Sequence, residues 1–192
     1  MDGFKKTAVG NISAKLEEEY ESKISELVNK INNSNLSQKN KLKIIYDYLV
    51  NSCEIYETFY MDGINQFPAS LDAGITTASK YGPIIKKKGV CKGFSLAFQD
   101  IAQRCRIKTE IIEGVHNGFG HGWIVALDNF DNFTPKHIDI YSGIKNKNNN
   151  KNIYDYFMIS TDKLYAIGDY SNFEESLNKA IQKLRGFKVL RK

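Results

Sequence analysis

Residues 89–105 read GVCKGFSLAFQDIAQRC: a cysteine between two glycines, followed by the spacing of a buried helix. From Phe94 onward, apolar or small side chains recur at intervals of three and four residues, as one face of an α-helix requires. This stretch predicts a central helix that begins at Cys91 and packs into the core. The side chains of its apolar face are Phe94, Ala97, Phe98, Ile101, Ala102 and Cys105.

Two helical segments precede this central helix. Residues 13–32 carry apolar side chains at helical spacing, and a second helix is predicted from Ser37, a good N-cap, to Val50. We expect residues 1–35 to form a helical extension. Residues 36–192 are expected to form a single catalytic core domain.

Strand-like segments follow the central helix, and a last helix ends the chain. The run of Asn and Lys at 146–152 indicates a solvated loop, and Ser171-x-x-Glu174 is a capping box that opens the last helix. Helices therefore come first and an antiparallel sheet follows, which is typical of the α+β class. The predicted architecture is a helix carrying Cys91 packed on an antiparallel sheet, with N-terminal helices and a C-terminal helix around it. The predicted strands lie at 109–113, 121–127, 136–141 and 156–159.

The composition is that of one ordinary globular domain. The chain has 192 residues, of which 42% are hydrophobic and 26% charged. Three cysteines are too few for a disulfide scaffold, and no stretch approaches the roughly 18 consecutive apolar residues of a membrane span. These features disfavour disordered, fibrous and membrane-spanning proteins.

Charge and the N-terminus bear on partners and location. Lys and Arg outnumber Asp and Glu by 27 to 22, but the basic residues are scattered, which disfavours nucleic acid as a partner. The first residues, MDGFKK, lack the apolar region of a signal peptide and indicate a cytoplasmic protein for the chain as written. A longer natural N-terminus would leave a secreted or surface location open. The sequence carries no signature of the oligomeric state.

Cys91 is the candidate nucleophile. A helix N-terminus and a neighbouring protonated histidine both favour a thiolate, and together they lower the pKa of a cysteine from about 8.5 to about 3.5–7.5. The alternative is that Cys91 is one more buried small hydrophobe. Cys53 and Cys105 lack this setting, and we predict that both are structural.

A nucleophilic thiol needs a base, and the base needs an orienting group. If the strands that carry His121 and Asp139 form a hairpin, their side chains project from the same face, where the carboxylate fixes the imidazole tautomer. His137 shares the parity of Asp139 and is the rival base, whereas His116 falls in a loop and is expected to be exposed. A metal site at His121, His137 and Asp139 is disfavoured because paired CxxC and HExxH motifs are missing. We expect no metal and no cofactor.

At these residues the sequence resembles the bacterial transglutaminase-like superfamily of papain-like thiol enzymes. The segment GVCKGFS (89–95) resembles its nucleophile motif "GVCxGYA", HGW (121–123) resembles "HAW", and HID (137–139) resembles "HVD". The similarity extends over about residues 36–170, with every element in family order. Further matches are IYDYLV (45–50) to "IHDYLV", YGPII (81–85) to "YGALV" and YFMIS (156–160) to "YFLVS".

This resemblance implies a papain-like fold with Cys91 as nucleophile, His121 as general base and acid, and Asp139 as orienter. A thioester intermediate would be stabilised by the backbone N–H of Cys91, with Tyr81 as candidate second donor. Trp123 would shield the pair from water. The chain departs from the family where Ile124 replaces an Asn and where DIYS (139–142) replaces "DVTW".

A Cys-His-Asp set supports acyl transfer from an amide but does not choose the acceptor. Water as acceptor makes the protein a cysteine protease or amidohydrolase, and we favour this because the sequence shows no dedicated amine site. The alternatives are a protein-glutamine transglutaminase or deamidase, and a catalytically silent binding module with the same fold. The expected partner is a protein or peptide substrate.

Overall fold

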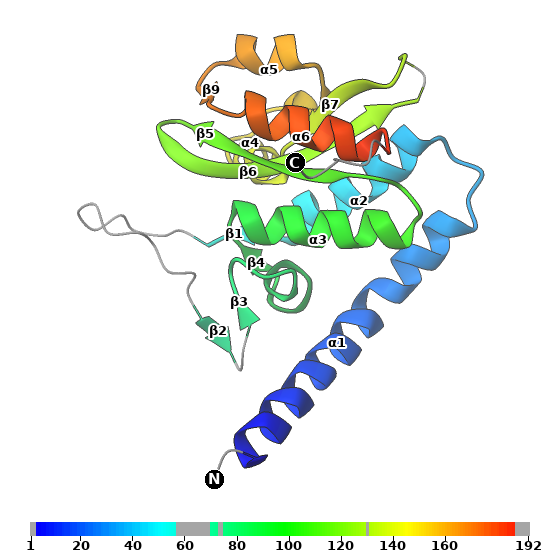
Figure 1. Cartoon of the computed structure of the whole chain (residues 1–192), viewed down its shortest axis with the longest axis vertical. Helices are drawn as coiled ribbons and strands as arrows, with labels where there is room; N and C mark the ends of the chain where they lie inside the picture. The colour runs from blue at the N-terminus through cyan, green and yellow to red at the C-terminus, as the bar shows by residue number, and fades with distance from the viewer. Residues whose placement is uncertain (1–2, 57–69, 73–74, 130, 187–192) are drawn as a thin grey trace, which may run out of the picture.

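The computed structural model describes residues 3–56, 70–72, 75–129 and 131–186 (Figure 1). Its helices are α1 (Gly3–Asn32), α2 (Gln38–Ser52), α3 (Cys91–Arg104), α4 (Ile140–Asn148), α5 (Thr161–Ile167) and α6 (Glu174–Leu184), with a π-helical turn η1 (Gly82–Lys86) and a 3₁₀ turn η2 (Ile153–Tyr156). Its strands are β1 (Glu54–Ile55), β2 (Ser70–Asp72), β3 (Ile75–Thr76), β4 (Lys88–Gly89), β5 (Glu110–His116), β6 (Phe119–Asp128), β7 (Thr134–Ile138), β8 (Phe157–Ile159) and β9 (Tyr170–Ser171).

A five-stranded antiparallel sheet in the order β8-β7-β6-β5-β9 organises the molecule. The long strands β5 and β6 pair along the whole length of β5, and β6 pairs with β7 from Ile124↔Ile138 to Asp128↔Thr134. Two short ladders, β1 with β4 and β2 with β3, lie outside this sheet. The hairpin expected between the strands of His121 and Asp139 is therefore present.

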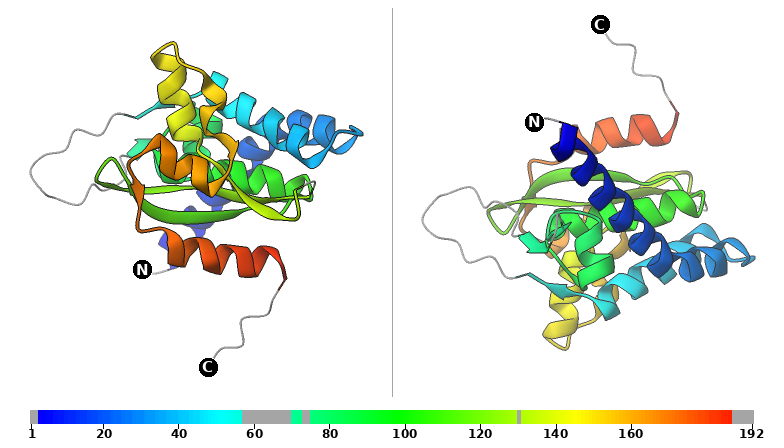
Figure 2. Two further views of the ribbon diagram at one scale, coloured as in Figure 1. Left: turned by 90° about the horizontal axis from the view of Figure 1, so that it is seen from above. Right: turned by 90° about the horizontal axis from the view of Figure 1, so that it is seen from below.

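Side chains that alternate along β6 build an apolar layer on each face of the sheet, as strand geometry dictates. Ile124 and Ala126 join the cluster formed with α2 and α3, whereas Trp123 and Val125 join the cluster formed with α6. Figure 2 shows α6 on one side of the sheet and α2 on the other. The predicted α+β architecture is confirmed, including the central helix that begins at Cys91.

Three local predictions are wrong. The strand predicted at 136–141 ends at Ile138, and Ile140 and Tyr141 form the start of α4. Ser171 lies in β9 and does not cap α6, which begins at Glu174. The Asn- and Lys-rich segment predicted as a loop contains the last turn of α4, and Asn146 is buried there, where its side-chain amide donates to the Asn152 carbonyl at 2.8 Å. Although this segment is polar, it belongs to a helix whose N-cap is Asp139.

Helix α1 packs against the core along its C-terminal half. Tyr20, Ile24 and Ile31 are buried, and the Tyr20 hydroxyl donates to Asp100 of α3 at 3.0 Å. The boundary at residue 35 stays a prediction. Within the described part of the chain, the helices lack the combination of length and apolarity that crossing a membrane requires.

Candidate active site

Cys91 occupies the first position of α3. The preceding residue, Val90, is extended, and its N–H donates to the Thr77 carbonyl at 3.0 Å. A Cβ added to Gly93 would lie 2.2 Å from that same oxygen, so only glycine lets the Thr77 segment pack against the first turn. The two glycines around Cys91 thus hold the thiol at a helix N-terminus, where backbone N–H groups favour negative charge.

His121 and Asp139 come from neighbouring strands. His121 lies in β6, and Asp139 directly follows β7, where it is the N-cap of α4. Nε2 of His121 lies 2.7 Å from Oδ2 of Asp139, and the two residues are 8% and 2% exposed. Since Nε2 is engaged by the carboxylate, Nδ1 is the ring nitrogen left for the Cys91 thiol, whose pKa this histidine lowers. The structure brings the three predicted residues together.

Further donors surround the Asp139 carboxylate. The Tyr170 hydroxyl donates to Oδ2 at 2.6 Å, and the Ser142 hydroxyl donates to the same oxygen at 2.8 Å. The backbone N–H of Ser142 donates to Oδ1 at 3.1 Å. A buried charge is tolerated only where such hydrogen bonds compensate for lost water, so this shell keeps Asp139 ionised beside His121.

Two opposing effects set the pKa values of Asp139, His121 and Cys91: burial disfavours the charged form, and pairing favours it. Burial raises the pKa of Asp139 and lowers the pKa of His121. The attraction and hydrogen bond between the two side chains outweigh burial, so the pKa of Asp139 lies well below its usual range and the pKa of His121 lies above its usual range. For Cys91, burial raises the pKa, whereas His121 and the Gly122 backbone N–H lower it, and the net shift is downward. These directions favour a thiolate beside an imidazolium.

His137 lies apart from this set. Its Nδ1 accepts from the Trp123 indole at 3.0 Å, so Nε2 carries the proton and donates to the Thr161 hydroxyl, also at 3.0 Å. Burial lowers the pKa of His137 to about 4, which keeps the ring neutral. Both ring nitrogens are therefore used within the core, and Trp123 itself is buried and stacks on His121 with the ring centroids 5.7 Å apart.

One sequence expectation is wrong at this point, and the role of Tyr81 as candidate second oxyanion donor stays a prediction. The Tyr81 hydroxyl donates to Glu17 of α1 at 2.7 Å. His116 is not an exposed loop residue: it ends β5, is half-buried, and stacks on Tyr170 with the ring centroids 4.0 Å apart. Burial lowers its pKa to about 4.

His116, His121 and Asp139 also form a candidate metal-ligand group within the described residues. One ligand atom from each lies within 4.8 Å of the others. The group differs from the set considered in the sequence, because His116 takes the place of His137. Asp139 and His121 already bond to each other, so a metal would have to displace that contact.

A cleft of about 580 Å³ opens beside Cys91. It gives the partly exposed thiol a route to solvent, and its wall at β6 is low because Gly120 and Gly122 carry no side chains. The arrangement can therefore receive a ligand at the thiol. The lining residues are Cys91, Lys92, Ile111, Glu113, Gly114, Gly120, His121, Gly122 and Ser176.

Sequence reasoning missed Tyr170 and Ser142, the two side chains that hold Asp139. Ser142 follows an aspartate at the spacing of an N-cap, which is a readable local signal. Tyr170 lies 31 positions after Asp139, in the two-residue edge strand β9, and no local sequence pattern indicates its role.

Comparison with known proteins yields likeness to solved structures only. No protein-family model matches the chain, and no curated protein matches its sequence. A solved structure of a candidate cysteine protease from Cytophaga hutchinsonii is 16% identical, with a TM-score of 0.44. The match covers 62% of this chain and 37% of that one, so the chain spans well under half of that protein's length. At this identity the likeness concerns the fold alone.

Proposed function

We propose that the protein is a thiol-dependent acyl-transfer enzyme that hydrolyses an amide bond through a thioester on Cys91. The observation that carries this proposal is the hydrogen bond between His121 and Asp139 beside Cys91, with Cys91 and His121 both lining one open cleft; these three residues are here called the triad. The resemblance of residues 36–170 to the bacterial transglutaminase-like superfamily supports the same three roles.

In the first half of the reaction, the Cys91 thiolate attacks the amide carbonyl carbon and the carbonyl electrons move to oxygen. The Cys91 backbone N–H lies at the start of α3 and bonds to no other backbone group in the described part of the chain, and it is the proposed donor to that oxyanion. When the tetrahedral intermediate collapses, the C–N bond breaks and the His121 imidazolium protonates the leaving amine. The products of this step are a thioester and a neutral imidazole.

In the second half, water replaces the amine. His121 takes a proton from the water as its oxygen attacks the thioester carbonyl, and the C–S bond then breaks to give the Cys91 thiolate and a carboxylic acid, which loses its remaining proton to solvent. Asp139 does not accept the proton. Its role is to hold the imidazole by Nε2 and to stabilise its cation, for which the donors Ser142 and Tyr170 keep it ionised.

Hydrolysis is favoured over amine transfer because Cys91 is partly exposed in a cleft open to water. A primary amine can compete with water for the thioester only where the site excludes water. The two outcomes leave different atoms in the product, which makes them separable in one experiment.

The test incubates the full chain with a defined mixture of synthetic peptides in water enriched in oxygen-18, with a dansylated primary amine present. The proposal predicts new peptide termini or deamidated glutamines that carry oxygen-18, and loss of both with Cys91→Ala, while Cys105→Ala retains them. Incorporation of the dansyl amine would reassign the protein as a transglutaminase. An unreactive peptide mixture together with an unreactive Cys91 thiol would contradict the proposal.

A further inference from the structure

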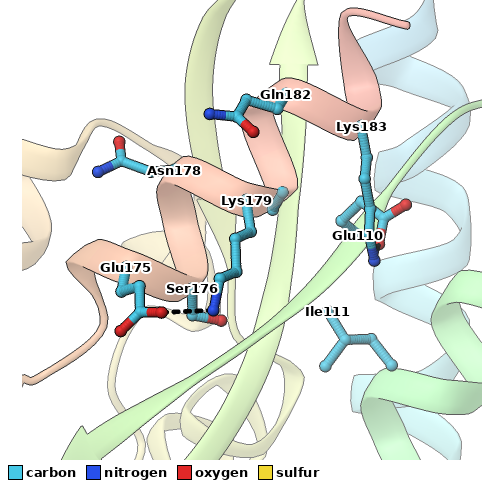
Figure 3. A pocket seen from close by; sticks show the side chains of 9 residues that line it. Glu110, Ile111, Glu175, Ser176, Asn178, Lys179, Gln182 and Lys183 are labelled. Atoms are coloured by element: carbon cyan, nitrogen blue, oxygen red, sulfur yellow. Dashed lines mark hydrogen bonds and ion pairs between the residues drawn. The ribbon is translucent and has the colours of Figure 1, made fainter. Parts of the chain in front are cut away.

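The cleft at Cys91 continues into a second hollow. This second hollow, of about 760 Å³, lies between β5 and α6 and shares Ile111 and Ser176 with the cleft. Figure 3 shows side chains of α6 along one side of it, with Glu110 and Ile111 of β5 along the other. Together the two hollows form one trough, which we call the β5 groove, running from Cys91 toward Lys183.

The backbone of β5 forms the wall of this groove. Strand β9 pairs with β5 only at Val115 and His116, so the outer edge of β5 before Val115 has no neighbouring strand in the described part of the chain. The Glu113 N–H donates outward to the Ser176 hydroxyl at 3.0 Å. In an antiparallel strand the N–H and C=O of one residue point to the same edge, and alternate residues share that edge. Ile111 therefore presents both of its backbone groups to the groove.

Within the described residues, the backbone groups of Ile111 and the Glu113 carbonyl have no hydrogen-bond partner on this edge. The positions at either end of this edge do have partners. The Thr109 carbonyl accepts a hydrogen bond from Gln99 at 2.9 Å, and Val115 pairs with β9. An open edge between two closed positions is a template for one more short extended strand.

The side chains around the groove fit a peptide better than a single charged ligand. Ile111 and the buried Ala180 give it an apolar floor. The charges at its rim neutralise one another in pairs, Glu110 with Lys183 at 3.4 Å and Glu175 with Lys179. Backbone hydrogen bonds supply affinity in this mode of recognition, and side chains of mixed character are tolerated.

We infer that the β5 groove binds an extended peptide segment of the substrate, through backbone hydrogen bonds to Ile111 and Glu113, and so delivers an adjoining amide to Cys91. This inference rests on the proposed function, because the groove leads to the thiol that would carry out the reaction. It narrows the substrate class from amides in general to polypeptides with an unfolded stretch several residues long.

The test uses thiol-reactive peptides of one, three and five residues on the full chain. One set carries a chloromethyl ketone at the C-terminus and a second carries an iodoacetyl group at the N-terminus, so that either direction of the bound peptide is sampled. The rate of Cys91 modification by each probe is read by mass spectrometry and divided by the same variant's rate with iodoacetamide. We expect this ratio to rise at least about tenfold from one residue to five in one of the two sets.

Two pairs of variants examine the groove itself. Ile111→Pro removes the outward N–H, which an edge position tolerates, and Ile111→Val keeps it while trimming the side chain. Ser176→Gln fills the junction of the two hollows, and Ser176→Ala leaves it open. The inference predicts that Ile111→Pro and Ser176→Gln abolish the rise with length and that Ile111→Val and Ser176→Ala retain it. The second pair decides the matter if Ile111→Pro does not fold.

Three results would overturn the inference. If the rate ratio does not depend on peptide length in either set while Cys91 reacts with iodoacetamide, the β5 groove does not bind the peptide, but the proposed function is not contradicted. A rise that survives both blocking variants places the peptide elsewhere. A dimer in light scattering that Ile111→Pro dissociates assigns the edge to a second copy of the chain. Failure of the proposed function is distinct, because Cys91 then reacts no faster with iodoacetamide than Cys53 or Cys105.

Discussion

The hydroxyl of Tyr170 is a sensitive point of the triad, because it donates to a carboxylate that is almost completely buried. Its oxygen lies 2.6 Å from Oδ2 of Asp139, whose residue is 2% exposed. A hydrogen bond to a charged group contributes about 1.5–3 kcal/mol to stability. Tyr170→Phe keeps the ring that stacks on His116 and removes this bond together with the 3.1 Å contact between the Tyr170 and Ser142 hydroxyls, so we expect the free energy of unfolding to fall by at least about that amount.

The chain offers a matched control at its surface. The Tyr165 hydroxyl donates to a Glu174 carboxylate oxygen at the same distance of 2.6 Å, but Tyr165 is 45% exposed. Exposed charge contacts contribute little to stability, because water replaces the lost partner. Tyr165→Phe should therefore cost clearly less than Tyr170→Phe.

The assay is urea denaturation at pH 7 followed by circular dichroism, with the slope against urea unchanged among the three proteins. In thermal unfolding, a domain of this size loses about 2–4 °C for each kcal/mol, so Tyr170→Phe should melt several degrees earlier. Equal losses for the two variants would refute the reasoning, because they would mean that burial gives the contact to Asp139 no added strength.

The remaining predictions concern the triad and its supports. Asp139→Asn should lower kcat by about 10⁴-fold because the amide sets the wrong tautomer of His121, whereas His137→Gln, beyond contact with the thiol, should lower it far less. Gly93→Ala should cost about 1–3 kcal/mol in urea denaturation, since the added carbon meets a backbone oxygen. The stability advantage of the wild type over Asp139→Asn should be greatest between about pH 4 and 6.5. Below this window the Asp139 carboxyl takes up a proton in the unfolded chain, while its lowered pKa keeps it ionised in the folded state, so folding requires proton release. Above the window the raised pKa of His121 makes folding require proton uptake. Denaturation at pH 3, 5 and 9 checks this, and a flat difference would contradict it.

The parts of the fold that could be predicted are those encoded by local patterns. The helix from Cys91 follows from apolar spacing and flanking glycines, and the hairpin that joins β6 to β7 follows from two strand-like segments close in sequence. Because strand register is set by the same local pattern, the approach of His121 to Asp139 could be predicted as well.

The parts that could not be predicted depend on contacts between distant segments. Tyr170 reaches Asp139 from a strand of two residues that has no periodicity of its own. Tyr81 is of a residue type that suits an active site, but its hydroxyl donates to Glu17, which lies 64 positions away in the sequence. The polar end of α4 is stabilised as a helix by Asp139 at its N-cap and by Asn146 bonding to Asn152, neither of which composition reveals.

The most direct test of the central claim is the rate of iodoacetamide alkylation at each cysteine from pH 4 to 9, read by mass spectrometry. Burial raises the pKa of both Cys53 and Cys105, so these two serve as internal references. The account predicts that Cys91 reacts rapidly already at pH 5–6, while the other two react only on unfolding. A Cys91 rate that rises only near its ordinary pKa of about 8.5, or no reaction, would contradict the activated thiol.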